Sequence, residues 1–183
     1  MEKISEKPHY VGSENHPIVA DYLVKELENL GLTTEIQEGF SLTKWGNLTK
    51  SKNILARIEG YKKGKALLLL SHYDSAPHSY SLGASDDGVG IVTILESIRA
   101  FLHNQTAHTN DIIILFTDAE ELGLNGAALF VTEHAWAKDV GVVVNLEARG
   151  SSGPSYMLME ATHGNRELLK SFVDSEAQFP ASN

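Results

Sequence analysis

The sequence predicts an α/β fold with three layers, in which a mostly parallel central sheet is flanked by helices. Continuous apolar runs at residues 66–72, 111–117 and 140–146 are typical of strands that are buried on both faces. Segments with apolar residues at helical spacing lie between these runs. Strands that alternate with helices in this way indicate a parallel sheet.

The remaining elements follow from spacing and from stop signals. Apolar residues at helical spacing follow Ser13, and Gly31 provides the stop for this first helix. Two strands are expected at residues 33–37 and 53–59, joined by a turn or hairpin tip that contains Trp45. Further helices are expected at residues 88–102, 125–134 and 165–173, and a weaker strand at 155–159.

Length, charge and cysteine content narrow the class of protein. A chain of 183 residues favours a single domain over residues 1–183. Its 15 Lys and Arg against 24 Asp and Glu give a net charge of -9, which argues against nucleic acid or an anionic membrane surface as a partner. The absence of cysteine excludes disulfides, cysteine-ligated zinc and thiol nucleophiles. Metal cations and cationic substrate groups remain as natural partners.

Polar residues gather where the three apolar strands end. His72 and Asp74 close the first strand, Glu120 and Glu121 follow the second, and Glu147 follows the third. Ligands of open α/β sheets bind beyond the carboxyl ends of the strands, so three parallel strands would deliver these groups to one edge. Taken singly, each carboxylate would be a solvated loop residue, but together they point to a site.

A histidine and several carboxylates without cysteine suit a divalent metal, because imidazole and carboxylate oxygen are normal zinc ligands. One carboxylate can bridge two zinc ions about 3.5–4 Å apart, and a free carboxylate then takes a proton from metal-bound water. The adjacent Glu120 and Glu121 could divide these jobs, one as ligand and one as general base.

Four linked motifs resemble the co-catalytic zinc aminopeptidases, the clan MH metallopeptidases. They are His72-x-Asp74, residues 83–90 (GASDDGVG), residues 118–126 (DAEELGLNG) and residues 145–147 (NLE). The family also includes glutamate carboxypeptidases, glutaminyl cyclases and the non-catalytic transferrin receptors. The resemblance runs from about Val11 to about Phe172 and implies the zinc-peptidase/phosphorylase-like form of the α/β fold. Residues 145–150 resemble the endoplasmic-reticulum metallopeptidase and vacuolar membrane protease branch, in which the peptidase domain is tethered to a membrane region.

The resemblance implies two zinc ions in the complete site. His72 and Glu147 would hold the first zinc. Many relatives have Asp at the position of Glu147. Asp86 would bridge both ions, and Glu121 would ligate the second.

The resemblance also implies roles around the metals. Glu120 would be the general base and would later protonate the leaving amine. Asp74 would orient His72 through the second ring nitrogen, as metal-bound imidazoles usually require. The peptide bond between Asp86 and Asp87 is expected to be cis.

One part of the family pattern is missing. The second zinc of the family takes a further histidine from a late segment, and nothing resembling that segment precedes Asn183. We therefore expect a chain that is truncated before its last metal-ligand segment and incomplete in its fold at that end. It would bind its second metal weakly and could be inactive as it stands.

Several histidines and one aspartate leave alternatives open. Asp87 could replace Asp86 as the bridge, His163 could be the missing ligand, and His78 could touch substrate, although a solvated loop position is favoured for His78. Solvated surface positions are expected for the other histidines: His9, His16, His103, His108 and His134.

The motifs favour a zinc-dependent exopeptidase, and within that class an aminopeptidase that acts on peptides with a free N-terminus. Metal-bound hydroxide would attack the first peptide carbonyl, with Glu120 as general base. The alternatives are a glutaminyl-cyclase-like zinc acyltransferase and a transferrin-receptor-like binding domain without catalysis. By the same resemblance, the parent protein would be membrane-tethered, and this domain would face the periplasm, a lumen or the exterior.

Overall fold

The computed structural model describes residues 1–62, 64–104, 107–150, 152 and 165–174. The chain divides into two compact units, Met1–Ala148 and Arg149–Asn183, and each is described by itself. In the second unit the structure describes helix α4 (Arg166–Asp174), where a helix was expected. The expected strand at residues 155–159 and His163 lie outside the described residues. A single domain over residues 1–183 stays a prediction.

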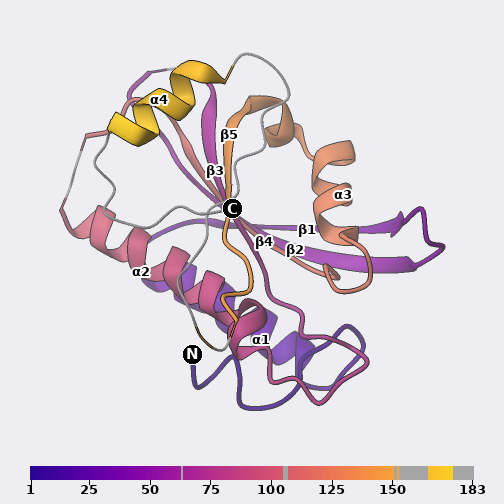
Figure 1. The fold of residues 1–183 in the computed structure, drawn as a ribbon. Coiled ribbons are helices and arrows are strands. Elements are labelled where there is room, and N and C mark those ends of the chain that lie inside the picture. Colours follow the sequence, from indigo (N-terminus) through magenta and orange to yellow (C-terminus); the bar gives the residue numbers. More distant parts are fainter. Residues whose placement is uncertain (63, 105–106, 151, 153–164, 175–183) are drawn as a thin grey trace. The chain divides into compact units, whose positions relative to one another are not determined.

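A mixed sheet of five strands forms the centre of the first unit within the described part of the chain (Figure 1). The strands are β1 (Thr34–Leu42), β2 (Leu48–Ile58), β3 (Ala66–His72), β4 (Ile112–Thr117) and β5 (Val140–Asn145), in the spatial order β1-β2-β4-β3-β5. β3 pairs in parallel with β4 and β5, whereas β2 pairs antiparallel with β1 and β4. Four of these five strands therefore run in one direction, which confirms the predicted mostly parallel sheet.

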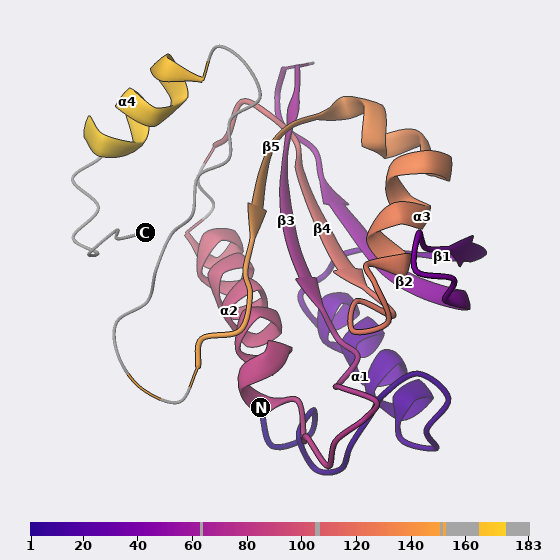
Figure 2. The same ribbon diagram turned by 45° about the vertical axis from the view of Figure 1, so that its right-hand side comes forward.

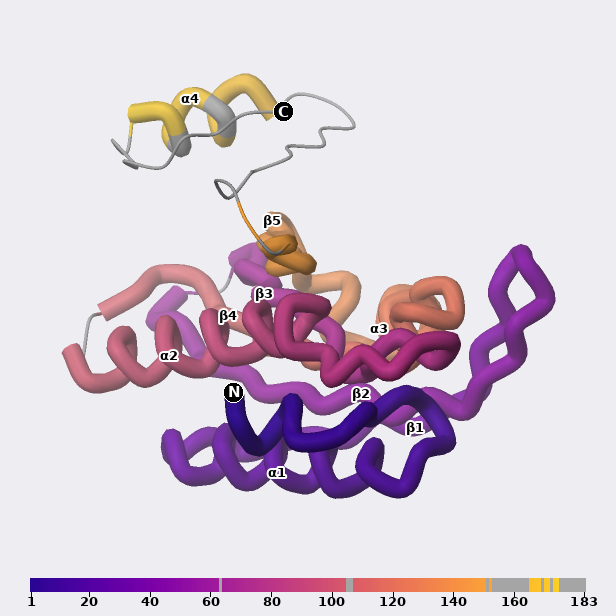
Figure 3. Tube along the Cα trace, turned by 60° about the horizontal axis from the view of Figure 1, so that its bottom comes forward, coloured from indigo at the N-terminus to yellow at the C-terminus, as the bar shows by residue number. Residues whose placement is uncertain are grey.

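Helices cover both faces of the sheet, as the three-layer prediction requires. Helix α1 (His16–Asn29) and helix α2 (Val89–His103) pack on one face, and helix α3 (Asn125–Glu133) packs on the other. Figure 2 places α2 and α3 on opposite sides of the strands, and Figure 3 shows α1 and α3 on opposite sides of β1 and β2. No helix within the described ranges is long and apolar enough to cross a membrane.

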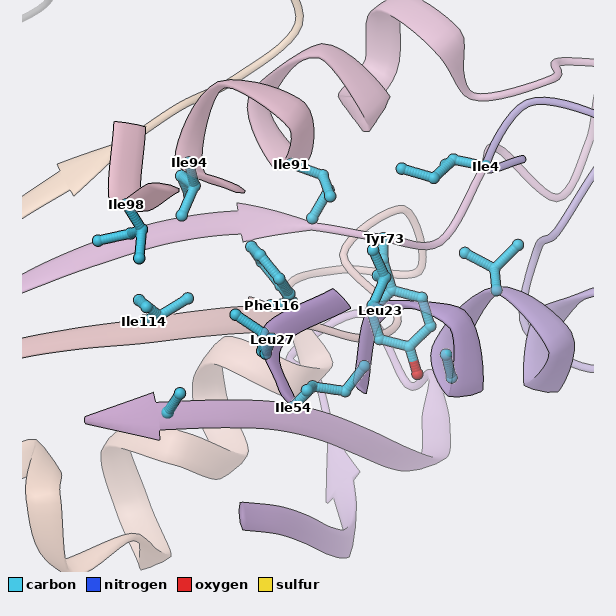
Figure 4. Close-up of a cluster of buried hydrophobic side chains, with 13 residues drawn as sticks. Ile4, Leu23, Leu27, Ile54, Tyr73, Ile91, Ile94, Ile98, Ile114 and Phe116 are labelled. Carbon is cyan, nitrogen blue, oxygen red and sulfur yellow. The ribbon is translucent and has the colours of Figure 1, made fainter. Parts of the chain in front are cut away.

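Alternating residues of β4 divide the core between the two faces. Ile114 and Phe116 belong to the cluster that α1 and α2 cover, and Ile113 and Leu115 belong to the cluster beneath α3. The larger cluster, drawn in Figure 4, also contains Tyr73, which follows β3 and is almost fully buried. This packing holds the carboxyl ends of β3 and β4 rigidly, and the predicted site residues follow those ends.

The prediction that residues 140–146 form a strand buried on both faces is wrong. Among the described residues β5 pairs with β3 alone, and Val143 and Val144 are 51% and 42% exposed. An apolar run is typical of a strand that is buried. Whether that strand lies at the edge of the sheet depends on neighbouring strands that are distant in the sequence. β1 and β2 are also longer than expected, because the hairpin pairing continues to Leu42 opposite Leu48.

Arg57 joins three strands at the sheet end opposite the predicted site. Its Nε donates to Asp111 Oδ2 at 2.8 Å just before β4, and its Nη1 donates to Asp139 Oδ2 at 2.7 Å just before β5. Asp111 Oδ1 accepts the Gly60 N–H at 2.8 Å. The Gly60 N–H and then Arg57 lower the pKa of Asp111.

Replacing Arg57 by Met should lower the free energy of unfolding at pH 7 by about 1–3 kcal/mol, because charged hydrogen bonds are lost from a partly buried cluster. The contribution of Asp111 is present above its unfolded-state pKa and is lost as the pH falls through its lowered folded-state pKa. The difference between the two proteins should therefore shrink below about pH 4. Urea unfolding at pH 7 and pH 3 measures both effects.

The matched control is Arg99→Met, since Arg99 pairs with Glu96 on the exposed surface of α2. This variant should unfold like the parent at both pH values. An Arg57→Met protein as stable as the parent at pH 7 would show that the cluster contributes nothing.

Candidate metal centre

The carboxyl ends of β3, β4 and β5 meet at one edge of the sheet, as predicted from their parallel order. His72 at the end of β3 lies opposite Thr117 on β4, and Leu70 lies opposite Asn145 on β5. The segments that continue from these three ends carry the predicted site residues: Asp74, Glu120, Glu121 and Glu147. The fourth predicted motif, which holds Asp86, enters from the turn before α2.

His72 lies at the centre of the site and is 2% exposed. Its Nε2 lies 3.0 Å from Asp86 Oδ1, 3.5 Å from Glu147 Oε1 and 4.0 Å from Glu120 Oε2. Burial lowers the pKa of His72, but hydrogen bonds to Asp74 and Glu147 outweigh it and raise this pKa to about 12. Carboxylates packed this densely favour a cation, which in the metal-free protein is the imidazolium itself.

The backbone carbonyl and the side-chain carboxylate of Asp74 have different partners. Its backbone carbonyl lies 3.0 Å from His72 Nδ1, whereas its carboxylate lies 3.5 Å from that nitrogen. The carboxylate oxygens accept the N–H groups of Glu120 at 3.0 Å and Glu121 at 3.2 Å. Asp74 therefore links the end of β3 to the segment after β4.

Asp86 and Asp87 face different surroundings. They lie in the short turn Ala84–Gly88, and the peptide bond between them is cis, as predicted. The Asp86 side chain is 47% exposed and faces His72. Asp87 is buried and accepts hydrogen bonds from the Ser71 hydroxyl and, at 3.0 Å, from the Gly90 N–H. Gly90 has no room for a Cβ beside the Asp87 carboxylate, so glycine permits this close approach.

Distance alone leaves the choice of bridging residue open. His72, Asp87 and Glu147 each offer one ligand atom, and these atoms lie within 4.8 Å of one another. The oxygens of Asp87 are, however, already engaged by Ser71 and Gly90, whereas Asp86 presents an oxygen to His72 from a half-exposed position. We therefore favour Asp86 as the bridge.

Glu120 and Glu121 follow β4 after a sharp turn at Ala119, whose φ is 55°. Burial, then the Glu147 and Asp74 carboxylates, raise the pKa of Glu120 to about 7 against the opposing effect of His72. Burial and then Asp86 also raise the pKa of Glu121. Glu121 Oε1 is a buried atom with no hydrogen-bond partner among the described residues.

This donor set fits a divalent metal. A buried carboxylate oxygen without a partner needs an explanation, and a bound metal ion is one that this cluster of donors allows. One imidazole and several carboxylates, with no cysteine in the chain, match the nitrogen and oxygen ligands of zinc. The first unit is therefore an α/β domain with a carboxylate-rich centre, suited to metal, beyond the carboxyl ends of its parallel strands.

Comparison with known sequences places the chain in a family. The model of peptidase family M28 matches residues 53–182, so the chain belongs to this family. A vacuolar membrane protease of Candida albicans is 35% identical over 178 residues, which cover 94% of this chain and 20% of the relative. A Caenorhabditis elegans protein whose name includes endoplasmic reticulum metallopeptidase 1-A is 36% identical over 129 residues, covering 69% of this chain and 14% of that protein. The chain thus spans about a fifth or less of the length of these relatives.

Solved structures show the same fold. A glutaminyl cyclase of Porphyromonas gingivalis matches with a TM-score of 0.71 and 25% identity over 85% of this chain and 59% of the cyclase chain. A zinc-dependent exopeptidase of Parabacteroides distasonis matches with a TM-score of 0.69 and 23% identity over 84% of this chain and 60% of its own. These matches confirm the predicted type of α/β fold, and the family model with the similar sequences confirms the predicted family resemblance.

Three histidines expected on solvated surfaces do not lie there. His9 is 1% exposed, with its Nδ1 3.1 Å from the Lys7 carbonyl. The side chains of His16 and His134 are 12% and 8% exposed, and each contacts a carboxylate. The prediction was wrong because all three make contacts that helix and loop patterns do not encode. His103 and His78 are exposed, as expected. His108 is a fourth exception to the surface prediction, because it is partly buried and its ring packs against Phe101.

Zinc should stabilise the metal-free protein, because a metal bound by the folded state alone shifts the unfolding equilibrium. At a free zinc concentration of 100 times Kd the gain is about 2.7 kcal/mol, and His72→Gln should abolish most of it. Thermal and urea unfolding with and without zinc measure the gain.

His103→Gln is the control, since His103 is exposed at the end of α2. It should keep the full response to zinc. If His72→Gln responded to zinc as strongly as the parent, the metal would be bound elsewhere.

Proposed function

We propose that this chain carries the metal centre of a zinc-dependent exopeptidase that removes the N-terminal residue of peptides. Membership of peptidase family M28 supports hydrolysis of peptides. The observation that carries the proposal is the position of Glu120, whose Oε2 lies 4.0 Å from the proposed ligand atom His72 Nε2. The Glu120 side chain is 28% exposed, so water can reach it.

The chain offers a defined set of metal ligands. His72 and Glu147 would hold a first zinc, and Asp86 would be shared between two zinc ions. Glu121 would hold the second zinc through its buried Oε1, which lacks a hydrogen-bond partner among the residues that the structure describes. Bound zinc would supply a lowered pKa for water and polarisation of the substrate carbonyl.

Glu120 performs the proton transfer in this proposal. Its carboxylate accepts the proton from the attacking water and later returns it to the leaving amine. The backbone of Glu120 does not need to move during these steps, because Asp74 holds the N–H groups of Glu120 and Glu121. Such fixed geometry is what general base catalysis requires.

The acidic surroundings favour a substrate with a free N-terminus. Asp86, Glu120 and Glu147 approach the same histidine from three different segments of the chain. An α-ammonium group is a natural partner for carboxylates that metal does not fully neutralise. This preference supports an aminopeptidase over an enzyme that recognises a free carboxylate.

A glutaminyl-cyclase-like acyl transfer is the second candidate, because a glutaminyl cyclase shares this fold at 25% identity. The presence of both Glu120 and Glu121 weighs against it, since a one-zinc cyclase would need fewer second-site ligands. A transferrin-receptor-like binding domain is the third candidate, and it would not need the metal residues that this chain retains.

The relatives suggest where the whole protein acts. Their names refer to the vacuolar membrane and the endoplasmic reticulum. We propose a membrane-associated parent protein that presents this domain, and its peptide substrates, on the lumenal or extracytoplasmic side.

Glu120→Gln should lower kcat for leucyl-anilide hydrolysis by at least about 10²–10⁴-fold, because the amide cannot accept the proton. Zinc content, measured by elemental analysis, should stay unchanged, since Glu120 is not a proposed ligand. Cyclisation of an N-terminal glutaminyl peptide, assayed in parallel, separates the two enzymatic candidates.

Glu133→Gln, at the exposed end of α3, is the control and should leave both measurements unchanged. If Glu120→Gln hydrolysed the substrate as fast as the unsubstituted protein, Glu120 would not be the general base. If neither this chain nor the whole protein bound zinc or showed either activity, the binding-domain candidate would be favoured.

A further inference from the structure

We infer that His16, through its contact with Asp118, is a positioning residue that fixes the direction in which Glu120 is presented. His16 does so without touching metal or substrate. The inference rests on the proposed function of Glu120, and it concerns a contact between the first helix and the end of β4.

Both oxygens of the Asp118 carboxylate have hydrogen-bond partners. It is 1% exposed, and its Oδ1 lies 2.8 Å from His16 Nε2. Its Oδ2 accepts the Lys52 N–H at 2.9 Å, and its own N–H donates to Asn53 Oδ1 at 3.2 Å. A buried carboxylate is stable only when such partners replace water. The imidazole of His16 supplies the contact that comes from outside the sheet.

The residue after Asp118 is strained. Ala119 is fully buried with a φ of 55°, a left-handed conformation that residues other than glycine adopt at a cost. Such a conformation persists only where the surrounding structure enforces it. Asp118 enforces it from the preceding side, and the Asp74 carboxylate enforces it from the following side by accepting the Glu120 and Glu121 N–H groups. Both anchors therefore contribute to the direction in which Glu120 leaves the turn, together with the Asn125 and Gly126 N–H groups that donate to the Ala119 and Asp118 carbonyls.

His16 is itself held in place behind the site. It is the first residue of α1, and its ring stacks on Tyr73 with ring centroids 5.1 Å apart and planes inclined by 24°. Tyr73 lies between His72 and Asp74 in the sequence, and its hydroxyl donates to the Lys52 carbonyl at 2.8 Å. Figure 4 shows Tyr73 within the core cluster beside the α1 side chain Leu23. Through His16, the core thus supports both strand ends that carry the site.

A second contact between a histidine and a carboxylate, that of His134 with Glu35, lies outside residues 118–121. His134 Nε2 lies 3.0 Å from Glu35 Oε1, and its ring stacks on Phe130 with centroids 5.3 Å apart and planes inclined by 22°. This pair joins the end of α3 to β1. Among the described residues, no hydrogen bond or ring contact links it to residues 118–121. The two histidines therefore compare the loss of a carboxylate contact beside the Glu120 turn with the loss of a similar contact elsewhere, although Glu35 is half exposed and Asp118 is buried.

The test compares His16→Phe with His134→Phe. Phenylalanine keeps an aromatic ring for stacking but removes the nitrogen that contacts the carboxylate. In the metal-free protein, His16→Phe should speed hydrogen exchange of the Glu120 and Glu121 amides by about tenfold or more, because the anchored turn opens more often. Exchange in α2 should not change and reports that the domain is folded, whereas α3 is no reference because its Asn125 and Gly126 N–H groups donate to the Ala119 and Asp118 carbonyls. His134→Phe should leave the Glu120 and Glu121 amides as they are in the parent.

The second readout is the kinetics of the zinc-loaded protein. His16→Phe should lower kcat by about 10–100-fold, since small displacements of a catalytic group cost rates of this order. KM should stay within about twofold, because proton transfer by Glu120 does not contribute to substrate binding. His16→Gln, whose side-chain amide can donate to Asp118, should restore both readouts. If His16→Phe does not fold, His16→Ala carries the same comparison.

Unchanged exchange at Glu120 and Glu121 in a folded His16→Phe protein would overturn the inference. Faster exchange with unchanged kcat would overturn it as well, as would equal losses in His134→Phe. A fully active Glu120→Gln protein would instead overturn the proposed function, while the exchange measurement would still decide whether His16 positions the turn.

Discussion

Four carboxylates approach the buried ring of His72, and their mutual repulsion is the constraint on which the rest of the structure depends. Asp74, Asp86, Glu120 and Glu147 each place an oxygen within 4.0 Å of one of its nitrogens. Like charges at this spacing separate unless a cation lies among them. In the metal-free protein the cation is the imidazolium, whose pKa is raised to about 12 after burial has opposed the shift. A divalent ion would supply more charge at the same place and would free His72 to act as a ligand.

Hydrogen bonds from backbone N–H groups offset part of the repulsion among the acidic side chains around the site. The carboxylates of Asp74, Asp87 and Asp118 all accept backbone N–H groups, from Glu120 and Glu121, from Gly90 and from Lys52 respectively. Each of these aspartates follows or precedes a residue of the site by a few positions. Their charge is neutralised locally by N–H dipoles. The Glu147 carboxylate likewise accepts the Ala148 N–H at 3.1 Å, in addition to its contact with His72.

The parallel strands explain which features could be predicted from the sequence. Strand ends of like direction share an edge, so the meeting of His72, Glu120 and Glu147 follows from three apolar runs and the polar residues after them. The edge position of β5 among the described strands could not be predicted, because the exposure of Val143 depends on neighbours distant in the sequence. The contact between His16 and Asp118 spans 102 residues and carries no local pattern. A histidine at the start of an amphipathic helix resembles any other surface histidine until tertiary packing is known.

The fold alone does not determine the reaction, since a glutaminyl cyclase and an exopeptidase have similar TM-scores to this chain, 0.71 and 0.69. The distinction must come from the residues that surround the reacting atoms. Hydrolysis needs a carboxylate that faces water near the metal ligands, and Glu120 meets this condition with 28% of its side chain exposed. It also benefits from a separate carboxylate for a second metal, and Glu121 Oε1, which is buried and has no hydrogen-bond partner within the described part of the chain, is suited to that task. Because Asp74 accepts the N–H groups of both residues, the two neighbouring carboxylates are anchored together, as the proposed division between a metal ligand and a general base requires. On that proposal the site is suited to hydrolysis.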